Sequence, residues 1–270
     1  MNRYERFFKE LKKRVHVPHF NFMMMKLDRI NQELQLDKGT LHVMNAIFYN
    51  DVWHSENVRI DNKGSNEAVL EFEYGTKKDL ITYLTHKNIK KKDIPRLIKK
   101  LENIRNTVKI IQTTKIPPFT INLIQDIHKH IMKGLLQDMG KFRTYLVKPS
   151  GSDFFYCNPK FIQKRLQRLI DFVQRELSKK IARKDKVLLG CLFFSEFLLI
   201  HPFCNGNGRT ARMLLSLFIE PPIPITFDSC CDDTYYSVLE ERLMHKDHAP
   251  VALTTYILKT MYQSINEIYY

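Results

Sequence analysis

Residues 187–200 of the chain form the feature that most limits the possible folds, because this run is apolar nearly all round. It reads VLLGCLFFSEFLLI, and only Ser195 and Glu196 interrupt it. The run is shorter than the roughly 20 residues that a helix needs to span a bilayer. A helix without a polar face belongs where other elements cover it on every side. The sequence therefore predicts a helix over 184–200 at the centre of a soluble helical bundle.

Apolar residues at helical spacing predict that most of the remaining chain is helical too. Thr120 is a suitable N-cap for one such helix, because its hydroxyl oxygen can accept a hydrogen bond from a free backbone N–H group. Two β-prone segments between Tyr145 and Tyr156 flank a Pro-Ser-Gly-Ser turn and predict one short hairpin. The expected fold class is therefore all-α with a single small β-hairpin. Further helices are expected at roughly 160–178, 207–219, 235–244 and 250–268.

The net charge of the 270-residue chain is +14, from 43 basic and 29 acidic side chains. This excess indicates an anionic partner, such as a nucleotide, a nucleic acid or a membrane surface. A solvated basic surface explains it equally well, because the lysines are spread along the whole chain. Nucleic acid is disfavoured as a partner, since no aromatic residues interleave with the lysines at 87–100.

Five cysteines occur without a regular spacing, which is typical of a protein that stays reduced inside the cell. The N-terminus is charged throughout and lacks the apolar core of a signal peptide. We therefore expect a cytoplasmic protein with no membrane partner. A homodimer is compatible with the sequence.

The segment 201–212 follows the apolar helix and reads HPFCNGNGRTAR. Pro202 is expected to end the preceding helix. Gly206 and Gly208 allow positive φ angles and a close approach of the backbone to a ligand. A helix that begins near Asn207 presents free N–H groups and the positive end of its dipole to this turn. The segment therefore predicts a binding site for an anion.

Two arginines and a histidine add chemistry to this turn. Arg209 and Arg212 are three residues apart and share one helix face, which suits a polyphosphate. His201 can serve as a general base at neutral pH. The glycines also match the dinucleotide fingerprint G-x-G-x-x-A, and Asp228 follows at a suitable distance for a ribose. The dinucleotide-binding Rossmann fold is disfavoured, because the apolar run before the glycines is too long for a strand.

The same segment resembles the motif of the Fic-domain family, H-x-F-x-[D/E]-G-N-G-R-x-x-R, at every specified position except Asn205. Residues 140–144 are similar to the family's G-x-F-R segment, which precedes a hairpin flap, and the helix around His128 resembles the first helix of the domain. The resemblance covers roughly residues 100–262. It implies a Fic-type helical bundle whose hairpin is the flap. We expect the domains to be an N-terminal helical region, 1–95, and a Fic catalytic domain with C-terminal helices, 96–270.

The resemblance implies a protein adenylyltransferase, an enzyme that moves AMP from ATP to a Ser, Thr or Tyr hydroxyl of a target protein. His201 would be the catalytic general base. The flap would bind the target as an added strand through Leu146, Val147, Lys148, Phe154 and Phe155. The nucleotide would be bound by Gly206, Asn207, Gly208, Arg209, Arg212, Tyr235 and Tyr236.

Asn205 departs from the family's pattern, in which an acidic residue holds the metal ion that bridges the phosphates. An amide oxygen can bind Mg²⁺ or Mn²⁺, but without a charge. Two alternatives therefore stay open: a weak or inactive relative that only binds nucleotide, and transfer of a different nucleotide or phosphate-containing group.

Glu56 is the candidate for self-inhibition. Many Fic proteins carry an inhibitory helix with the pattern [S/T]-x-x-x-E-[G/N], whose glutamate pairs with the second arginine of the motif. Residues 52–57 match it in part, because Glu56 and Asn57 fit but Val52 replaces the Ser or Thr. Glu56 would then pair with Arg212. An exposed acid at a helix end is the alternative.

Overall fold

A computed structural model describes residues 2–16, 20–25, 67–70, 72, 75–87, 89–113, 119–149, 154–219 and 232–268. All of the regular secondary structure that these residues form is helical, so the prediction of a helical fold is confirmed. The named elements are α1 (Arg3–Arg14), α5 (Lys77–His86), α6 (Ile94–Thr113), α7 (Ile121–Met132), the 3₁₀ turn η1 (Pro159–Phe161), α8 (Ile162–Leu177), α9 (Arg183–Ile200), α10 (Asn207–Ser216), α11 (Asp232–Met244) and α12 (Val251–Ile268).

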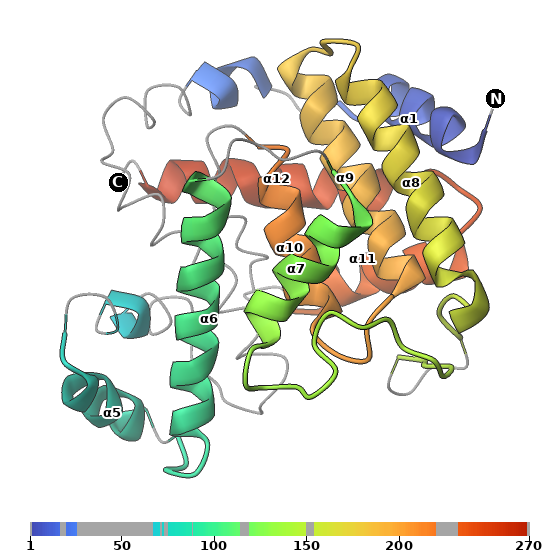
Figure 1. Ribbon diagram of the computed structural model, residues 1–270. Helices are drawn as coiled ribbons and strands as arrows, with labels where there is room; N and C mark the ends of the chain where they lie inside the picture. Colours follow the sequence, from blue (N-terminus) through green and yellow to red (C-terminus); the bar gives the residue numbers. More distant parts are fainter. Residues whose placement is uncertain are drawn as a thin grey trace.

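Helix α9 is the centre of the bundle, as its composition predicts. It packs against α1, α8, α10 and α12 (Figure 1). Every side chain from Val187 to Phe197 is buried, including Ser195 and Glu196. A Cβ atom on Gly190 would lie 2.6 Å from Cβ of Phe218, so this glycine allows the chain after α10 to approach closely. Each fully buried Phe or Leu side chain contributes about 1.5–3 kcal/mol of hydrophobic stabilisation.

Helix α7 lies beside α6, α8 and α10, and both of its ends are fixed. At its start, the hydroxyl oxygen of Thr120 accepts a 3.1 Å hydrogen bond from the N–H of Leu123, which confirms the predicted N-cap. At its end, Nδ2 of Asn103 on α6 donates to the carbonyl oxygens of Ile131 and Lys133, at 3.0 and 2.8 Å. These bonds satisfy carbonyl groups that a helix end otherwise leaves without partners.

A buried ion pair holds α11 against α9. Arg242 on α11 donates to the carboxylate of Glu196, and its Nε donates to Oγ of Ser195 at 2.8 Å. Arg3 on α1 reaches the same carboxylate at 3.4 Å. Removing one partner of such a buried pair would leave an uncompensated charge in the core. The pair therefore fixes α11 in place as a wall over the end of α9.

The predicted β-hairpin at 145–156 is the part of the fold prediction that is wrong, because the described residues of this segment form no strand. One backbone hydrogen bond joins its two sides, from the N–H of Tyr156 to the oxygen of Val147 at 3.1 Å. Leu146 and Phe155 are 52% and 53% exposed, so little apolar surface is buried. A single two-stranded hairpin is marginally stable in water, and this one lacks a packed face.

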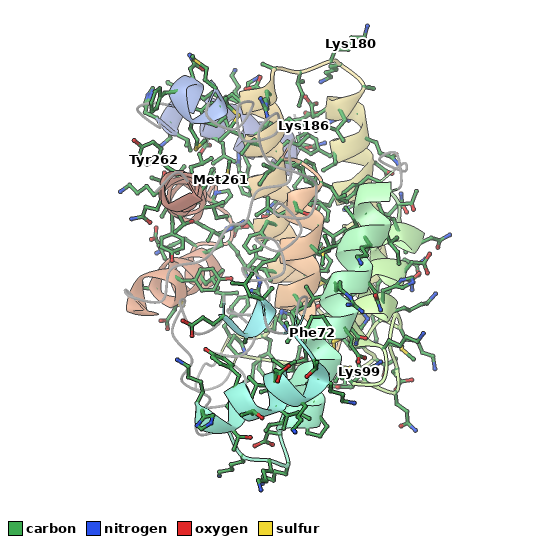
Figure 2. All side chains as sticks on the ribbon, turned by 90° about the vertical axis from the view of Figure 1, so that its left-hand side faces the viewer. Phe72, Lys99, Lys180, Lys186, Met261 and Tyr262 are labelled. Atoms are coloured by element: carbon green, nitrogen blue, oxygen red, sulfur yellow. The ribbon has the colours of Figure 1, made fainter. Side chains whose placement is uncertain are left out.

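In the side view of Figure 2, Lys180 lies at the top of the molecule with Lys186 below it, and Phe72 and Lys99 lie in the lower half. The guanidinium of Arg105 on α6 lies over the ring of Phe72, 4.9 Å from its centroid. No helix among the described residues is long and apolar enough to cross a membrane.

Candidate functional site

A cavity of about 310 Å³ lies where the end of α9, the start of α10 and α11 meet. Its size is at the lower end of the range for small-molecule sites. Part of its lining is apolar and comes from Leu198, Leu199, Leu239 and Leu243. The structure also brings eight of the predicted site residues to this cavity: His201, Asn205, Gly206, Asn207, Gly208, Arg209, Arg212 and Tyr235.

The turn between α9 and α10 depends on two residues with left-handed backbone. His201 ends α9 with φ 49° and ψ 61°, and its N–H donates to the oxygen of Phe197 at 2.8 Å. Gly206 is the N-cap of α10, with φ 77°. A Cβ atom there would lie 2.6 Å from Sδ of Met132 on α7. Glycine is therefore required at 206 both for its φ angle and for the space.

The side chain of Asn207 closes the turn. Its Oδ1 accepts a 2.9 Å hydrogen bond from the N–H of Phe203, and its Nδ2 donates to the oxygen of Phe203 at 2.8 Å. The ring of Phe203 is fully buried. The side chain of Asn207 is therefore occupied within the turn, and only its backbone is left to bind a phosphate.

His128 on α7 packs against the turn between α9 and α10 and stabilises it, a role that sequence reasoning missed. Its ring stacks on Phe203 with 3.7 Å between the centroids. Its Nδ1 accepts from the N–H of Gly140 at 2.7 Å, and its Nε2 donates to the oxygen of Asn205 at 3.0 Å. Burial lowers the pKa of His128 from 6.5 to about 4, so the ring is neutral at pH 7. The available signal was its position on the apolar face of α7, beside Ile124.

The start of α10 is open to an anion. Gly206 has no side chain to cap the helix, so the first N–H groups of α10 are left for a ligand. Arg209 and Arg212 both line the cavity, as their spacing predicts. Nε of Arg212 is buried and has no hydrogen-bond acceptor among the described residues, while the hydroxyl of Tyr235 interacts with this arginine. An anionic oxygen is the acceptor that such a donor needs.

The charge of the cavity is positive. Of the residues that line it, Arg209, Arg212 and Arg242 are cationic, and no described lining residue is Asp or Glu. Arg242 is committed to Glu196, behind the cavity wall. The remaining two arginines and the helix N-terminus all favour a bound anion.

The imidazole of His201 is uncharged at neutral pH. Burial is the main cause that lowers its pKa from 6.5 to about 4, and the charge of Arg143 acts in the same direction. A backbone interaction with Leu198 opposes them. The ring of Tyr156 covers His201, with the centroids 3.8 Å apart. A neutral histidine that lines an anion-binding cavity can accept a proton from a bound hydroxyl group.

Arg143 connects the turn between α9 and α10 to the predicted flap, which follows Arg143 in the chain. Its Nε donates to the oxygen of His201 at 2.7 Å, and its own N–H donates to Pro202 at 2.9 Å. Its terminal nitrogens donate to the oxygens of Tyr145 and Cys157, at 2.7 and 2.5 Å. A cation at the end of α9 is favoured by the helix dipole. These bonds also occupy carbonyl groups at both ends of the expected hairpin.

The described residues around the cavity do not form a resident metal site. Asn205 supplies one amide oxygen, which accepts a 2.6 Å hydrogen bond from the N–H of Gly206. The described lining has no carboxylate, and the described part of the chain has no cluster of three His, Cys, Asp or Glu suited to a metal ion. Mg²⁺ prefers charged oxygen ligands, so Asn205 alone is a poor site for it.

The remaining predicted residues lie elsewhere or outside the described part. Tyr236 is on α11 beside the buried Tyr235, but its side chain is not described. The ring of Phe154 lies under the ammonium of Lys246, at 5.6 Å. Glu56 lies outside the described residues. Among the described residues, the cavity lining does not include the predicted flap residues Leu146, Val147, Lys148, Phe154 and Phe155.

Sequence reasoning also missed several residues of the lining, Ser195 and Arg242 among them. Ser195 and Arg242 reach the cavity from α9 and α11. Ser195 carried a signal, because it is one of the two polar residues that interrupt the apolar run. Arg242 carried none, since its role depends on α11 packing against a distant helix.

In a comparison with known families, residues 118–219 match the model of the Fic/DOC family. The chain is 26% identical over 125 residues to protein adenylyltransferase fic-1 of Caenorhabditis elegans, covering 44% of this chain and 23% of that protein. It is 31% identical over 106 residues to the ribonucleoside-diphosphate reductase small chain of Ostreid herpesvirus 1, covering 36% of this chain and 18% of that protein. The matches therefore span less than a quarter of either relative.

Among solved structures, the chain is similar to a Fic-domain-containing signaling protein from Bacteroides thetaiotaomicron. The TM-score is 0.66 at 18% sequence identity, and the match covers 98% of this chain and 95% of that one. At this identity the likeness shows the fold alone.

Proposed function

Because residues 118–219 match the model of the Fic/DOC family, we propose that the chain is a Fic-family protein adenylyltransferase. It would transfer AMP from ATP to a Ser, Thr or Tyr hydroxyl of a target protein. The observation that carries the proposal is the cavity itself. There, the neutral ring of His201 shares one space with the open start of α10 and with Arg209 and Arg212.

The phosphates of ATP would bind at the start of α10. The backbone N–H groups of the first turn of α10, which no side chain caps, would contact phosphate oxygens, and Arg212 would hold the outer phosphates through its unsatisfied Nε. Arg209 would offset the negative charge that develops on the leaving pyrophosphate. Tyr235 and Tyr236 would lie near the nucleotide, on α11. The apolar walls of the cavity would cover the rest of the nucleotide.

In the transfer step, the target hydroxyl oxygen would attack the α-phosphorus of ATP. The new bond would join that oxygen to phosphorus, and the bond from the α-phosphorus to the bridging oxygen of the β-phosphate would break. Pyrophosphate would leave with its electron pair. His201 would accept the proton of the hydroxyl group, a contribution worth about 10²–10⁴ in rate.

The metal requirement follows from the lining. Because the described lining of the cavity holds no carboxylate, a Mg²⁺ or Mn²⁺ ion would arrive with the nucleotide and be held mainly by its phosphates. Asn205 would add at most one neutral ligand. The chemistry that the ion supplies when bound is charge neutralisation on the phosphates. The arginines and the helix N-terminus supply the same kind of stabilisation from the protein.

The target would bind along the segment 145–156. The described part of this segment has a single hydrogen bond between its sides and exposes Leu146 and Phe155. An extended peptide could therefore add to it through main-chain hydrogen bonds. A cytoplasmic setting belongs to the same proposal, because Cys157, Cys191 and Cys204 are free thiols.

A second candidate function is nucleotide binding without transfer. Asn205 favours it, because the position lacks the charge with which the family holds its metal ion. A transfer reaction with a different nucleotide or phosphate-containing donor fits the same lining.

Mass spectrometry of the purified chain after incubation with ATP and Mg²⁺ or Mn²⁺, alone and with cell lysate, tests the proposal. An added mass of AMP on a hydroxyl side chain supports adenylyl transfer. A different added mass identifies another donor. ATP binding without any added mass supports the binding module and contradicts the enzyme.

A further inference from the structure

The rings of Tyr156 and His201 lie flat against each other, with their centroids 3.8 Å apart and their planes within 11°. The two residues come from different segments. His201 ends α9, whereas Tyr156 lies in the described segment 154–158, just before η1. Both side chains line the cavity.

The backbone of His201 is fixed by hydrogen bonds, but Nδ1 of its ring lacks the hydrogen bond that usually orients a catalytic histidine. Its N–H and its carbonyl oxygen are bonded to Phe197 and Arg143, at 2.8 and 2.7 Å. Its Nδ1 atom is buried and has no hydrogen-bond partner among the described residues. The backbone of Leu198 is near enough to influence the pKa of His201, yet no hydrogen bond of normal geometry reaches Nδ1. A catalytic histidine is usually oriented by a group bonded to one ring nitrogen.

We propose that Tyr156 is the positioning residue for His201, and that the face of its ring orients the imidazole toward the cavity in place of a hydrogen-bonded carboxylate. This inference rests on the proposed function of His201 as the base. The stack also ties the base to the segment that would bind the target. Because the contact is between ring faces, the phenol hydroxyl is not needed for it, and phenylalanine should replace Tyr156.

Removing the ring would also expose the imidazole. Burial is the largest cause of the low pKa of His201, and Tyr156 covers one of its faces. With a smaller side chain, water would reach the ring and the charged form would cost less. The other polar groups around it would stay the same in every variant: Arg143 beside the turn, Cys204 in the turn, Arg209 and Arg212 on α10, and Tyr235 and Arg242 on α11.

The direct test is an NMR titration of the full chain labelled with ¹³C-histidine. The His201 signal is assigned by its loss in His201→Ala. The variants are Tyr156→Leu, which removes the ring, and Tyr156→Phe, which keeps it. Tyr145→Leu is the matched control, since Tyr145 is 56% exposed in the same region. We expect the His201 midpoint to stay near 4 in wild type, Tyr156→Phe and Tyr145→Leu, and to rise toward 6.5 in Tyr156→Leu.

Kinetics provide the second readout. In Tyr156→Leu, kcat for transfer should fall about 10- to 100-fold, as expected for a misplaced catalytic group, while KM for ATP stays largely unchanged. Tyr156→Phe should restore kcat. If Tyr156→Leu does not fold, Tyr156→Met takes its place in both experiments.

An unchanged His201 midpoint after removal of the ring would overturn the inference, as would a Tyr156→Phe variant as impaired as Tyr156→Leu. The titration needs no activity. If the wild-type chain transfers nothing, the proposed function fails, and the midpoints still decide whether Tyr156 positions the ring of His201.

Discussion

Nε2 of His128 donates a 3.0 Å hydrogen bond to the backbone oxygen of Asn205, while Nδ1 of the same ring accepts from the N–H of Gly140. One buried imidazole therefore joins α7, the loop before the predicted flap and the glycine turn. Both bonds need the neutral ring with its proton on Nε2. The turn that binds the anion is thus held by a group that can titrate.

Stability should consequently fall in mild acid. The pKa of His128 is lowered from 6.5 to about 4 in the folded chain, and that of His201 shifts in the same way. Between these values the unfolded chain binds more protons than the folded one, so the free energy of unfolding rises with pH in this window. The stabilisation that comes from keeping these histidines neutral is lost as the pH falls from 6.5 toward 4. Urea unfolding at several pH values gives the free energy of unfolding as a function of pH. The slope of this plot should be smaller for His128→Gln than for wild type. The exposed His130→Gln is the control, and equal slopes for all three proteins would contradict the account.

Gly206→Ala should destabilise the chain and weaken ATP binding. The left-handed backbone at this position costs a non-glycine residue about 1–2 kcal/mol, and the new methyl group would meet Sδ of Met132. The double variant Gly206→Ala, Met132→Ala removes the clash but keeps the backbone strain. Thermal unfolding and calorimetric ATP binding measure both effects. A fully stable Gly206→Ala with normal ATP affinity would mean that the turn is formed differently.

Arg212→Ala should weaken ATP binding about 10- to 100-fold, because a charge-assisted hydrogen bond contributes about 1.5–3 kcal/mol. AMP binding should change much less, since Arg212 is proposed to hold the outer phosphates. The exposed Arg168→Ala on α8 lowers the net charge equally and should leave both affinities unchanged. Calorimetric titrations with ATP and AMP make the comparison. Equal losses for the two nucleotides would place Arg212 elsewhere in the site.

Asn205→Asp should raise the transfer rate at limiting Mg²⁺. A carboxylate would give the metal-nucleotide complex a charged ligand where only an amide is present. Asn205→Ala removes the oxygen and is the matched control. The transfer rate is measured while Mg²⁺ is titrated at constant ATP. A rate for Asn205→Asp that stays at or below wild type at every concentration would show that this position does not contact the metal.

Much of the fold could be predicted from the sequence because its strongest signals are local. The apolar run at 187–200 specifies a central helix, Thr120 is an N-cap, and the glycines specify the turn before α10. The hairpin was wrong because β-propensity alone does not supply a packed face. The carbonyl oxygens of Tyr145 and Cys157 are instead bound by Arg143.

The site residues that lie close together in the sequence could be predicted, but those that tertiary packing brings in from distant segments could not. His201, Arg209 and Arg212 lie within one motif, and the structure brings them to one cavity. Tyr156 and His128 reach the same turn only through tertiary packing, and no spacing in the sequence connects them with it. The division between residues 1–95 and 96–270 stays a prediction.

The most direct test of the proposed function uses ATP labelled at the α-phosphate, with wild type and His201→Ala measured side by side for incorporated label and for ATP affinity. The proposal predicts label on protein with the wild-type chain and none with His201→Ala, at similar ATP affinity, because the base is lost and the phosphate site is kept. Equal labelling by the two proteins would contradict the role of His201. Absence of label with a wild-type chain that binds ATP would contradict adenylyl transfer itself.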